Sequence, residues 1–371
     1  MKKTLSIILV FSFVAFICCG YKPAAEPDIS AQSAVLYDPL FGEFIFEKNA
    51  DVRRGMASTT KIMTAVIAAE LYDLDAEIEI QPKWCGAEGS SMYLQSGERL
   101  SVRELLYGLL LASGNDAATA LSYIYSGNPE DFVALMNRKA RELGLEDTHF
   151  DNPSGLDGET HFSTAKDMAM LAAYAMENET VASVAACRSI RLGDRYLKNH
   201  NKLLELFEGT TGIKTGFTKA CGRCLVSAVQ RNGRMFIAVT LNAPDDWNDH
   251  MRMYEGAFSG LSRSDIVCAG DLGTVPVLSG SLRESRLYVN EGFSAYLRPE
   301  EQARIGISIK GARFCYAPVR AGEPYGELRV LCKDRIIFST PIYFSDSVNL
   351  TEREGNSLWD RIQNIFRRKN L

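Results

Sequence analysis

The stretch CLVSAVQRNGRMFIAVTL, residues 224–241, contains two apolar runs separated by Asn232-Gly233. Asn-Gly between such runs is the strongest short signal for a β-hairpin, because both residues tolerate positive φ. Two more strands are predicted within SAVLYDPLFGEFIFEK, residues 33–48, around a turn at Pro39–Gly42. Strands at both ends of a helical region predict an α/β sandwich, in which the N-terminal strands pair beside the late hairpin.

The region between these strands is rich in helix-forming residues. Four helices are predicted there, at residues 58–72, 101–125, 129–143 and 164–176. The second begins with Ser101-x-x-Glu104, the pattern of a capping box in front of an apolar run. Residues 26–264 are therefore predicted to form one α/β (α+β) domain.

The composition changes after about Ser264. Between 265 and 348, short β-type runs such as TVPVLSG and SRLYVNEG alternate with turn residues, which predicts a small all-β domain. The tail at 349–371 changes again, because residues 357–371 combine an apolar helical arc with several cations. The arc contains Leu358, Trp359, Ile362, Ile365 and Phe366, and the cations are Arg361, Arg367, Arg368 and Lys369. We expect this helix to lie on a membrane surface; a helix docked on the protein itself and a frayed tail are the alternatives.

The first 25 residues have the form of a secretory signal peptide. Lys2 and Lys3 precede a mostly apolar run from Leu5 to Cys19, which is too short to span a bilayer comfortably. We therefore expect an exported protein. An uncleaved N-terminal anchor is one alternative, and the cysteines at 18 and 19 leave a lipoprotein signal open.

Composition excludes some classes of function. The net charge of -5 supplies no basic excess for nucleic-acid binding. The four histidines show no metal-ligand spacing, so we expect no metal and no other cofactor. Cys221-Gly-Arg-Cys224 has the spacing of a redox or zinc pair, but residues three apart on a strand face opposite sides. We interpret both as small apolar core residues.

Three short polar motifs occur in order along the chain. Ser58-Thr-Thr-Lys61 opens the first predicted helix, Ser113-Gly114-Asn115 interrupts the second, and Lys214-Thr215-Gly216 precedes the hairpin. Each motif alone is a weak signal, and an isolated Ser-x-x-Lys is usually an N-cap serine followed by a solvent-exposed lysine. All three together, in this order, favour a serine nucleophile with a lysine base.

Elementary chemistry explains why a lysine follows the serine. A serine hydroxyl needs a neighbouring base, and positions i and i+3 of a helix share a face, so Lys61 can reach Ser58. Lysine is a base only when neutral, so its pKa must fall by about three units, roughly 4 kcal/mol. Burial supplies part of this shift, and Lys214 as a second cation supplies more. The N–H of Ser58, at a helix N-terminus, can also stabilise an oxyanion.

The second motif lies within an otherwise apolar helical stretch. Polar groups such as Ser113 and Asn115 cost free energy there unless they have partners, and Gly114 weakens the helix. A break of this kind is typical of side chains that point into a cleft; a plain helix–helix turn is the alternative.

Together the motifs resemble the active-site triplet of the serine-type D-alanyl-D-alanine carboxypeptidases, the low-molecular-mass penicillin-binding proteins. Segments similar to that family also occur at 89–92, 152–156, 163–167, 199–204, 212–218 and 317–330. The resemblance spans about residue 30 to the end. It implies the penicillin-recognising serine transferase fold, an antiparallel sheet with helices on both faces followed by a small β domain, on the extracytoplasmic face of a bacterial membrane.

The resemblance implies catalytic roles for three residues. Ser58 is acylated, Lys61 is its base, and Ser113 relays a proton. The implied substrate is a peptidoglycan stem peptide ending in D-Ala-D-Ala, from which the terminal D-alanine is removed, and β-lactam antibiotics are implied covalent inhibitors.

The resemblance also implies substrate-binding roles. Asn115 holds the substrate amide, and Lys214 tunes the electrostatic field of the site. Thr215, followed by Gly216, contacts the terminal carboxylate. The Phe217 N–H is the implied second oxyanion-hole donor. Some relatives carry His at that position and Arg or Thr where His200 stands, so carboxylate recognition is expected to differ in detail.

Two other functions are compatible with parts of the pattern. A serine β-lactamase shares two of the motifs but needs an added base for deacylation, usually a Glu in an E-x-x-L-N segment. No such segment lies between Ser113 and Lys214, and Gly114 stands where Asp is expected. The other alternative is an inert peptidoglycan-binding module, against which the intact Ser58, Lys61 and Lys214 argue.

Overall fold

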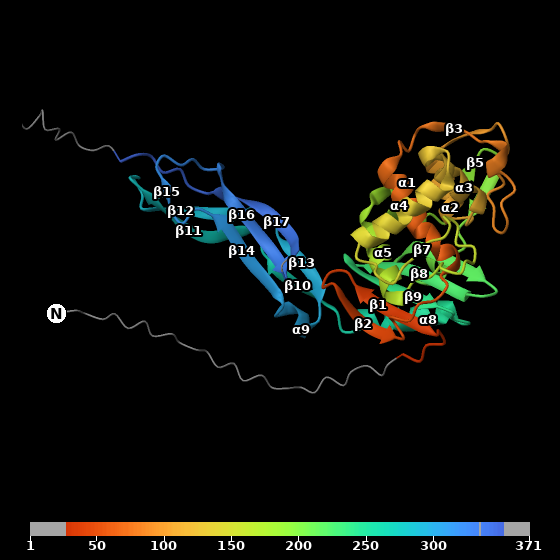
Figure 1. Ribbon diagram of the computed structural model, residues 1–371. Coiled ribbons are helices and arrows are strands. Elements are labelled where there is room, and N and C mark those ends of the chain that lie inside the picture. The colour runs from red at the N-terminus through yellow and green to blue at the C-terminus, as the bar shows by residue number, and fades with distance from the viewer. Residues whose placement is uncertain (1–26, 334, 352–371) are drawn as a thin grey trace, which may run out of the picture.

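The computed structural model describes residues 27–333 and 335–351. The predicted signal peptide at 1–25 and the predicted amphipathic helix at 357–371 lie outside these ranges. Figure 1 shows a helix-rich N-terminal domain and an elongated β-rich C-terminal domain placed end to end.

A five-stranded antiparallel sheet, in the order β2-β1-β9-β8-β7, forms the centre of the N-terminal domain. Its strands are β1 Ser33–Asp38, β2 Glu43–Lys48, β7 Thr210–Thr218, β8 Gly222–Arg231 and β9 Arg234–Leu241. Asn232 and Gly233, both at positive φ, form the two-residue turn between β8 and β9, so the predicted hairpin is confirmed. The expected pairing of β1 with the hairpin is also confirmed, because β1 lies beside β9.

Helices cover both faces of this sheet. On one face, Met253 and Tyr254 of α8 (Asp246–Phe258) pack on buried side chains of β1 and β9. On the other face, a larger apolar core joins the sheet to the remaining long helices. These are α1 Lys61–Leu71, α2 Val102–Leu110, α3 Asn115–Ser126, α4 Pro129–Glu142, α5 Ala165–Glu177 and α6 Glu179–Ala186. Shorter elements are η1 Ala57–Thr60, η2 Pro82–Trp84, α7 Leu203–Leu206, and the strand pairs β3 Glu77–Glu79 with β4 Arg99–Ser101 and β5 Ser189–Leu192 with β6 Arg195–Lys198.

Two predicted helices differ from expectation in detail. The helix expected at 101–125 is divided into α2 and α3 at the second motif, and its Ser101–Glu104 capping box is present. The helix expected from Ser58 begins as the 3-10 turn η1 and becomes α-helical only at Lys61. Neither α6 nor α8 was predicted.

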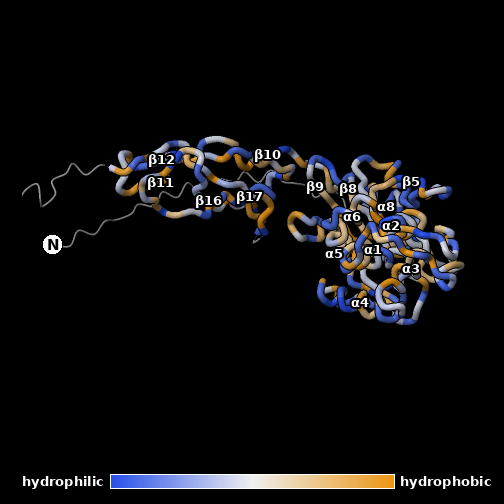
Figure 2. Tube along the Cα trace, turned by 90° about the horizontal axis from the view of Figure 1, so that it is seen from above, coloured by the Kyte–Doolittle hydropathy of each residue, from blue (hydrophilic) through white to orange (hydrophobic). Residues whose placement is uncertain are grey.

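The C-terminal domain is built of strands, as predicted. Its main sheet has six strands in the order β14-β16-β17-β12-β11-β15, and a second pair is β10 with β13. The strands are β10 Ser262–Val267, β11 Gly270–Leu278, β12 Glu284–Val289, β13 Phe293–Leu297, β14 Ile305–Gly311, β15 Cys315–Tyr316, β16 Pro324–Cys332 and β17 Arg335–Phe344, with one short helix, α9 Pro299–Gln302. Seen from above in Figure 2, this domain is narrow, and apolar and polar residues alternate along its strands. This alternation buries one side of β11, β12, β16 and β17 in a small apolar core.

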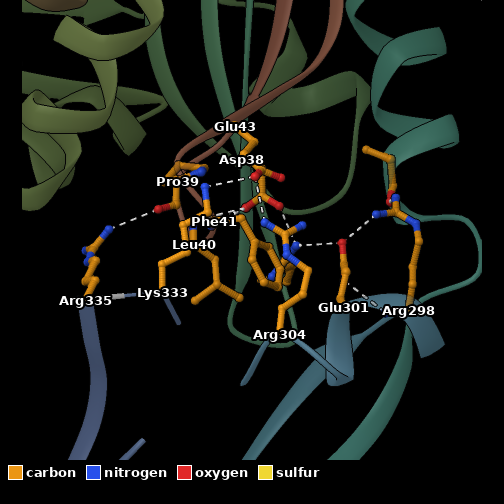
Figure 3. A network of polar contacts seen from close by, with 12 residues as sticks. Asp38, Pro39, Leu40, Phe41, Glu43, Arg298, Glu301, Arg304, Lys333 and Arg335 are labelled. Carbon is orange, nitrogen blue, oxygen red and sulfur yellow. Dashed lines mark hydrogen bonds and ion pairs between the residues drawn. The ribbon is translucent and has the colours of Figure 1, made fainter. Parts of the chain in front are cut away.

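A buried ionic network joins the two domains (Figure 3). Arg234 of β9 contacts Asp38 at 2.5 Å and Glu301 of α9 at 3.2 Å, and all three side chains are almost fully buried. Arg298 holds Glu301 at 2.7 Å. Burial raises the pKa of Asp38 to about 6, although the nearby Arg234 acts in the opposite direction. Because Asp38 ends β1, this network ties the five-stranded sheet directly to the C-terminal domain.

Candidate active site

Ser58 and Lys61 lie one turn apart where η1 passes into α1. The Lys61 Nζ lies within hydrogen-bonding distance of the Ser58 Oγ, at 3.0 Å. Lys61 has no exposed surface, and the residues that follow it in the first two turns of α1 are buried as well. The nucleophile and base implied by the sequence are therefore in direct contact.

The surroundings of Lys61 favour a neutral amine. Burial lowers the pKa of Lys61 well below its usual value, and the neighbouring charge of Lys214 lowers it further. Two acceptors, the Asn115 Oδ1 at 2.6 Å and the Ser154 carbonyl oxygen, contact the same Nζ. A neutral amine has two N–H donors for these acceptors and one lone pair left for the Ser58 hydroxyl proton.

The loop at 152–156 supplies the Ser154 carbonyl. The Asn152 Oδ1 accepts hydrogen bonds from the backbone N–H groups of Ser154, Gly155 and Leu156 at 2.7–3.2 Å. Gly155 has φ +87°, and a Cβ there would lie 2.0 Å from the Ala57 carbonyl oxygen. Asn152 and Gly155 therefore allow this loop to pack against η1. In the sequence, this loop was indicated by the segment at 152–156 that resembles the family.

Strand β7 brings the third motif against the nucleophile. A Cβ on Gly216 would lie 3.0 Å from both the Ser58 amide nitrogen and the Met56 carbonyl oxygen, so a larger residue would press on the backbone that carries the nucleophile. Lys214, two residues earlier on the same side of the strand, is almost fully buried, and burial lowers its pKa to about 7. Its Nζ donates to the Thr215 carbonyl oxygen at 2.9 Å.

The second motif occupies the junction of α2 and α3. Ser113 adopts a left-handed conformation with φ 59°, which costs a non-glycine residue about 1–3 kcal/mol and persists only where packing imposes it. Asn115 is the first residue of α3, and its Nδ2 donates to the Glu88 carbonyl oxygen. Both ends of the Asn115 amide are thus engaged within the chain, one of them by Lys61.

These residues surround a cavity of 310 Å³. Six of the nine residues singled out from the sequence line it, namely Ser58, Ser113, His200, Thr215, Gly216 and Phe217. The other three, Lys61, Asn115 and Lys214, are buried behind its wall. A larger groove of 890 Å³ adjoins the cavity and shares Ser90, His200 and Lys202 with it. All nine residues therefore converge on one place.

Several cavity residues were not predicted. Arg223 lies opposite Phe217 in the β7–β8 ladder and forms a bidentate pair with Asp246 at 2.8–3.1 Å. The Arg223 guanidinium also lies 5.5 Å from the ring centre of Trp247. Arg223 lies just before the predicted hairpin, and its place opposite Phe217 depends on the β7–β8 pairing, which was not predicted. Asp246 and Trp247 begin the unpredicted helix α8.

The remaining sequence predictions concern cysteines and metals. Cys224 is buried in β8, whereas Cys221 is half-buried, and both are free thiols in the described part of the chain. The core interpretation is thus right for Cys224 and incomplete for Cys221, whose Sγ lies 3.3 Å from an Asp157 carboxylate oxygen. Within residues 27–333 and 335–351 no group of three or more His, Cys, Asp or Glu side chains is placed to bind a metal. No helix in the same ranges has the length and apolarity to cross a membrane.

Known proteins resemble this chain in sequence and in structure. Residues 21–245 match the peptidase S11 family, described as D-alanyl-D-alanine carboxypeptidase. The chain is 32% identical over 365 residues to D-alanyl-D-alanine carboxypeptidase DacF of Bacillus subtilis, covering 92% of this chain and 93% of DacF. It is 29% identical to DacD of Escherichia coli over the full length of both. The crystal structure of DacD from Francisella tularensis matches with a TM-score of 0.62 and 27% identity, covering 89% of this chain and 96% of that one.

Proposed function

The chain belongs to the peptidase S11 family of D-alanyl-D-alanine carboxypeptidases, and we propose that Ser58 is the residue on which it forms the acyl-enzyme. It is a serine-type enzyme that releases the terminal D-alanine of D-Ala-D-Ala peptides. The observation that carries the proposal is the 3.0 Å contact between the Ser58 hydroxyl and the fully buried Lys61 amine.

The proposed reaction has two acyl-transfer steps. The Ser58 Oγ attacks the carbonyl carbon between the two D-alanines while its proton passes to the neutral Lys61 Nζ. The oxyanion then collapses, the C–N bond breaks, and the leaving amine takes up a proton relayed through Ser113. Water hydrolyses the Ser58 ester, and Lys61 is again the base. The N–H groups of Ser58 and Phe217 are the proposed oxyanion-hole donors.

Recognition of the peptide ends is proposed to use both cavities. Thr215 and Arg223 line the smaller cavity, where a hydroxyl and a guanidinium suit the terminal carboxylate of D-alanine. The remainder of the stem peptide is proposed to lie in the adjoining groove. Asn115, whose Oδ1 is 2.6 Å from Lys61, is proposed to hold the base as well as the substrate amide. Lys214 and His200 complete the site, and burial lowers the pKa of His200.

The chain organisation supports a location outside the cytoplasm. We infer that residues 1–25 are an export signal, 26–264 the catalytic domain, 265–348 the small β domain and 349–371 a tail that binds the membrane surface. The basis for the signal and the tail is the sequence pattern alone. Penicillin and related β-lactams are the expected covalent inhibitors, since they acylate the same serine.

Product analysis tests this function. The purified enzyme is incubated with a pentapeptide ending in D-Ala-D-Ala, and we expect free D-alanine from wild type and none from Ser58→Ala. The same peptide with a C-terminal amide should react much more slowly if Thr215 and Arg223 bind the carboxylate. Labelled penicillin separates the alternatives: a stable adduct supports the carboxypeptidase, rapid turnover a β-lactamase, and no adduct an inert module. An added amine acceptor reports any transfer to an amine in place of water.

A further inference from the structure

The end of the C-terminal domain that lies farthest from the catalytic sheet exposes several large apolar side chains. This end carries β15 and the adjoining end of β11 (Figure 1). The exposed residues there are Leu278, Leu282, Phe314, Tyr316 and Leu350, each between 43 and 65% exposed. We call these five residues the distal tip. Exposed apolar groups that gather in one place, rather than singly, indicate a binding surface.

Strand alternation explains why part of the distal tip points outward. β11 and β15 run parallel, and Val277 pairs with Cys315 while Leu278 pairs with Tyr316. Val277 and Cys315 belong to the domain core, so the next residue along each strand faces away from it. Phe314 precedes Cys315 by one residue and therefore also faces away from the core. Its ring packs edge-on against the Tyr316 ring, with 5.6 Å between the ring centres.

The last described residues of the chain are fastened to the same place. Leu350 forms a bridge with Gly280 in the turn after β11, and the Thr351 N–H donates to the Ser279 carbonyl oxygen at 2.9 Å. Leu282 lies in that turn. The last described residues therefore lie at the distal tip, and the predicted amphipathic helix at 357–371 follows them in the sequence.

Basic side chains accompany these apolar groups. Residues 310–320 contain Lys310, Arg313 and Arg320 and no acidic residue, and Arg283 follows Leu282. In the residues that the structure describes, none of these four cations forms an ion pair. Four acids lie near these cations. Asp346 is paired with Arg286 at 3.0 Å, and Glu284 accepts a hydrogen bond from Thr274. Glu327, opposite Lys310 in the β14–β16 ladder, is paired with Arg329 at 2.6 Å, and the Glu323 carboxylate accepts the Arg320 backbone N–H at 3.2 Å. Free cations beside exposed Leu, Phe and Tyr match the headgroup region of an anionic bilayer.

We propose that the distal tip is a membrane contact in its own right, which binds anionic lipid headgroups independently of the tail at 352–371. A second copy of this chain fits the surface less well, since two tips would bring like charges together. The proposal extends the proposed membrane location of the enzyme. It implies that the C-terminal domain stands on the membrane and holds the catalytic cavity at a fixed height above it.

Vesicle binding of the exported protein tests this proposal. Four forms are compared: wild type, a tip variant (Leu282→Ser, Phe314→Ser, Tyr316→Ser), a tail variant (Trp359→Ser, Ile362→Ser, Phe366→Ser) and their combination. All share one N-terminus, so any contribution from it cancels. The matched control is Ile307→Ser with Ile309→Ser, two exposed apolar residues of β14 in the same domain. Vesicles contain either phosphatidylglycerol with phosphatidylethanolamine or phosphatidylcholine alone.

We expect the tail variant to cosediment with phosphatidylglycerol vesicles and the combined variant to bind at least tenfold more weakly. Binding by the tail variant should weaken with added salt and be low on phosphatidylcholine, and the β14 control should bind like wild type. Equal binding by the tail and combined variants, or an equal loss in the β14 control, would overturn the proposal. The proposal would also be overturned if the tail variant formed a dimer that dissociates when the tip substitutions are added. The distal tip would then bind a second copy of the chain. Penicillin labelling of every variant reports the folding of its catalytic domain, and circular dichroism reports that of the β domain. A wild type that binds vesicles but takes no label would refute the proposed function alone.

Discussion

The Nζ of Lys61 lies 3.0 Å from the Oγ of Ser58, at the junction of a 3-10 turn and the helix that follows it. Burying a lysine with no exposed surface costs free energy, because burial disfavours its charged form. The same burial makes its amine a proton acceptor. The unfavourable burial of Lys61 is therefore what makes the Ser58 hydroxyl reactive.

Replacing Lys61 with methionine should remove the base while keeping a side chain of similar length. We expect Lys61→Met to slow acylation by penicillin by about 10²–10⁴-fold, the usual contribution of a general base. Stopped-flow or gel-based labelling rates measure this, with circular dichroism as a check on folding. Lys139→Met is the matched control: this lysine pairs with Glu70 on the helical surface and should leave the rate unchanged. A Lys61→Met protein that acylates at the wild-type rate would contradict the assignment.

Gly216 tests the close approach of β7 to the nucleophile. A methyl group there would lie 3.0 Å from the Ser58 amide nitrogen, so Gly216→Ala should displace an oxyanion-hole donor. Loss of one such donor costs about 10²–10³-fold in rate, and we expect a substantial part of this in the acylation rate. Gly256→Ala is the control, because nothing lies within 4 Å of a Cβ at this position in α8. That change should leave the rate intact and raise stability by up to about 1 kcal/mol.

The network between the domains gives a prediction about stability. Arg234→Met would leave Asp38 and Glu301 buried with one partner fewer, and breaking a buried ion pair costs about 3–5 kcal/mol. Urea denaturation followed by circular dichroism measures the change. Arg263→Gln removes an exposed pair with Asp265 and should cost under about 1 kcal/mol. Equal losses in the two variants would mean that the network contributes no more than a surface pair.

Acid should destabilise the protein through a buried histidine under the sheet. Burial lowers the pKa of His250 from 6.5 to about 3 in the folded chain, and its ring contacts the hydroxyl groups of Ser227 and Thr240. Between these two values the unfolded chain binds a proton that the folded chain does not. The free energy of unfolding should therefore fall as the pH drops from about 6.5 toward 3.

Urea titrations at several pH values, for wild type and His250→Asn, measure this dependence. We expect a flatter profile for the variant below pH 6.5. Part of the slope should remain, because burial also lowers the pKa of His161, to about 4. Parallel profiles for the two proteins would exclude His250 as a source of acid sensitivity.

Local signals in the sequence were sufficient for much of the fold. Asn232-Gly233 predicted the β8–β9 hairpin because its conformation depends on two adjacent residues alone. The Ser101–Glu104 capping box located the start of α2 for the same reason. The three motifs also indicated which residues would lie together, because a serine nucleophile and its lysine base must be in contact to react.

Features that depend on distant partners were missed. Helix α8 buries Asp249, whose carboxylate accepts from the backbone and hydroxyl groups of Ser30, so its inner face lacks a clean apolar pattern. The Ser154 contact with Lys61 comes from a backbone carbonyl, which no side-chain pattern reveals. The buried pair of Arg234 and Asp38 likewise joins residues far apart in the sequence.

The most direct test of the account is to locate the covalent adduct. Wild type, after brief exposure to penicillin, is digested and its peptides are analysed by mass spectrometry. We expect one added acyl group, carried by the Ser58 hydroxyl, and no adduct in Ser58→Ala. An adduct on a different side chain, or undiminished labelling of the alanine variant, would contradict Ser58 as the nucleophile.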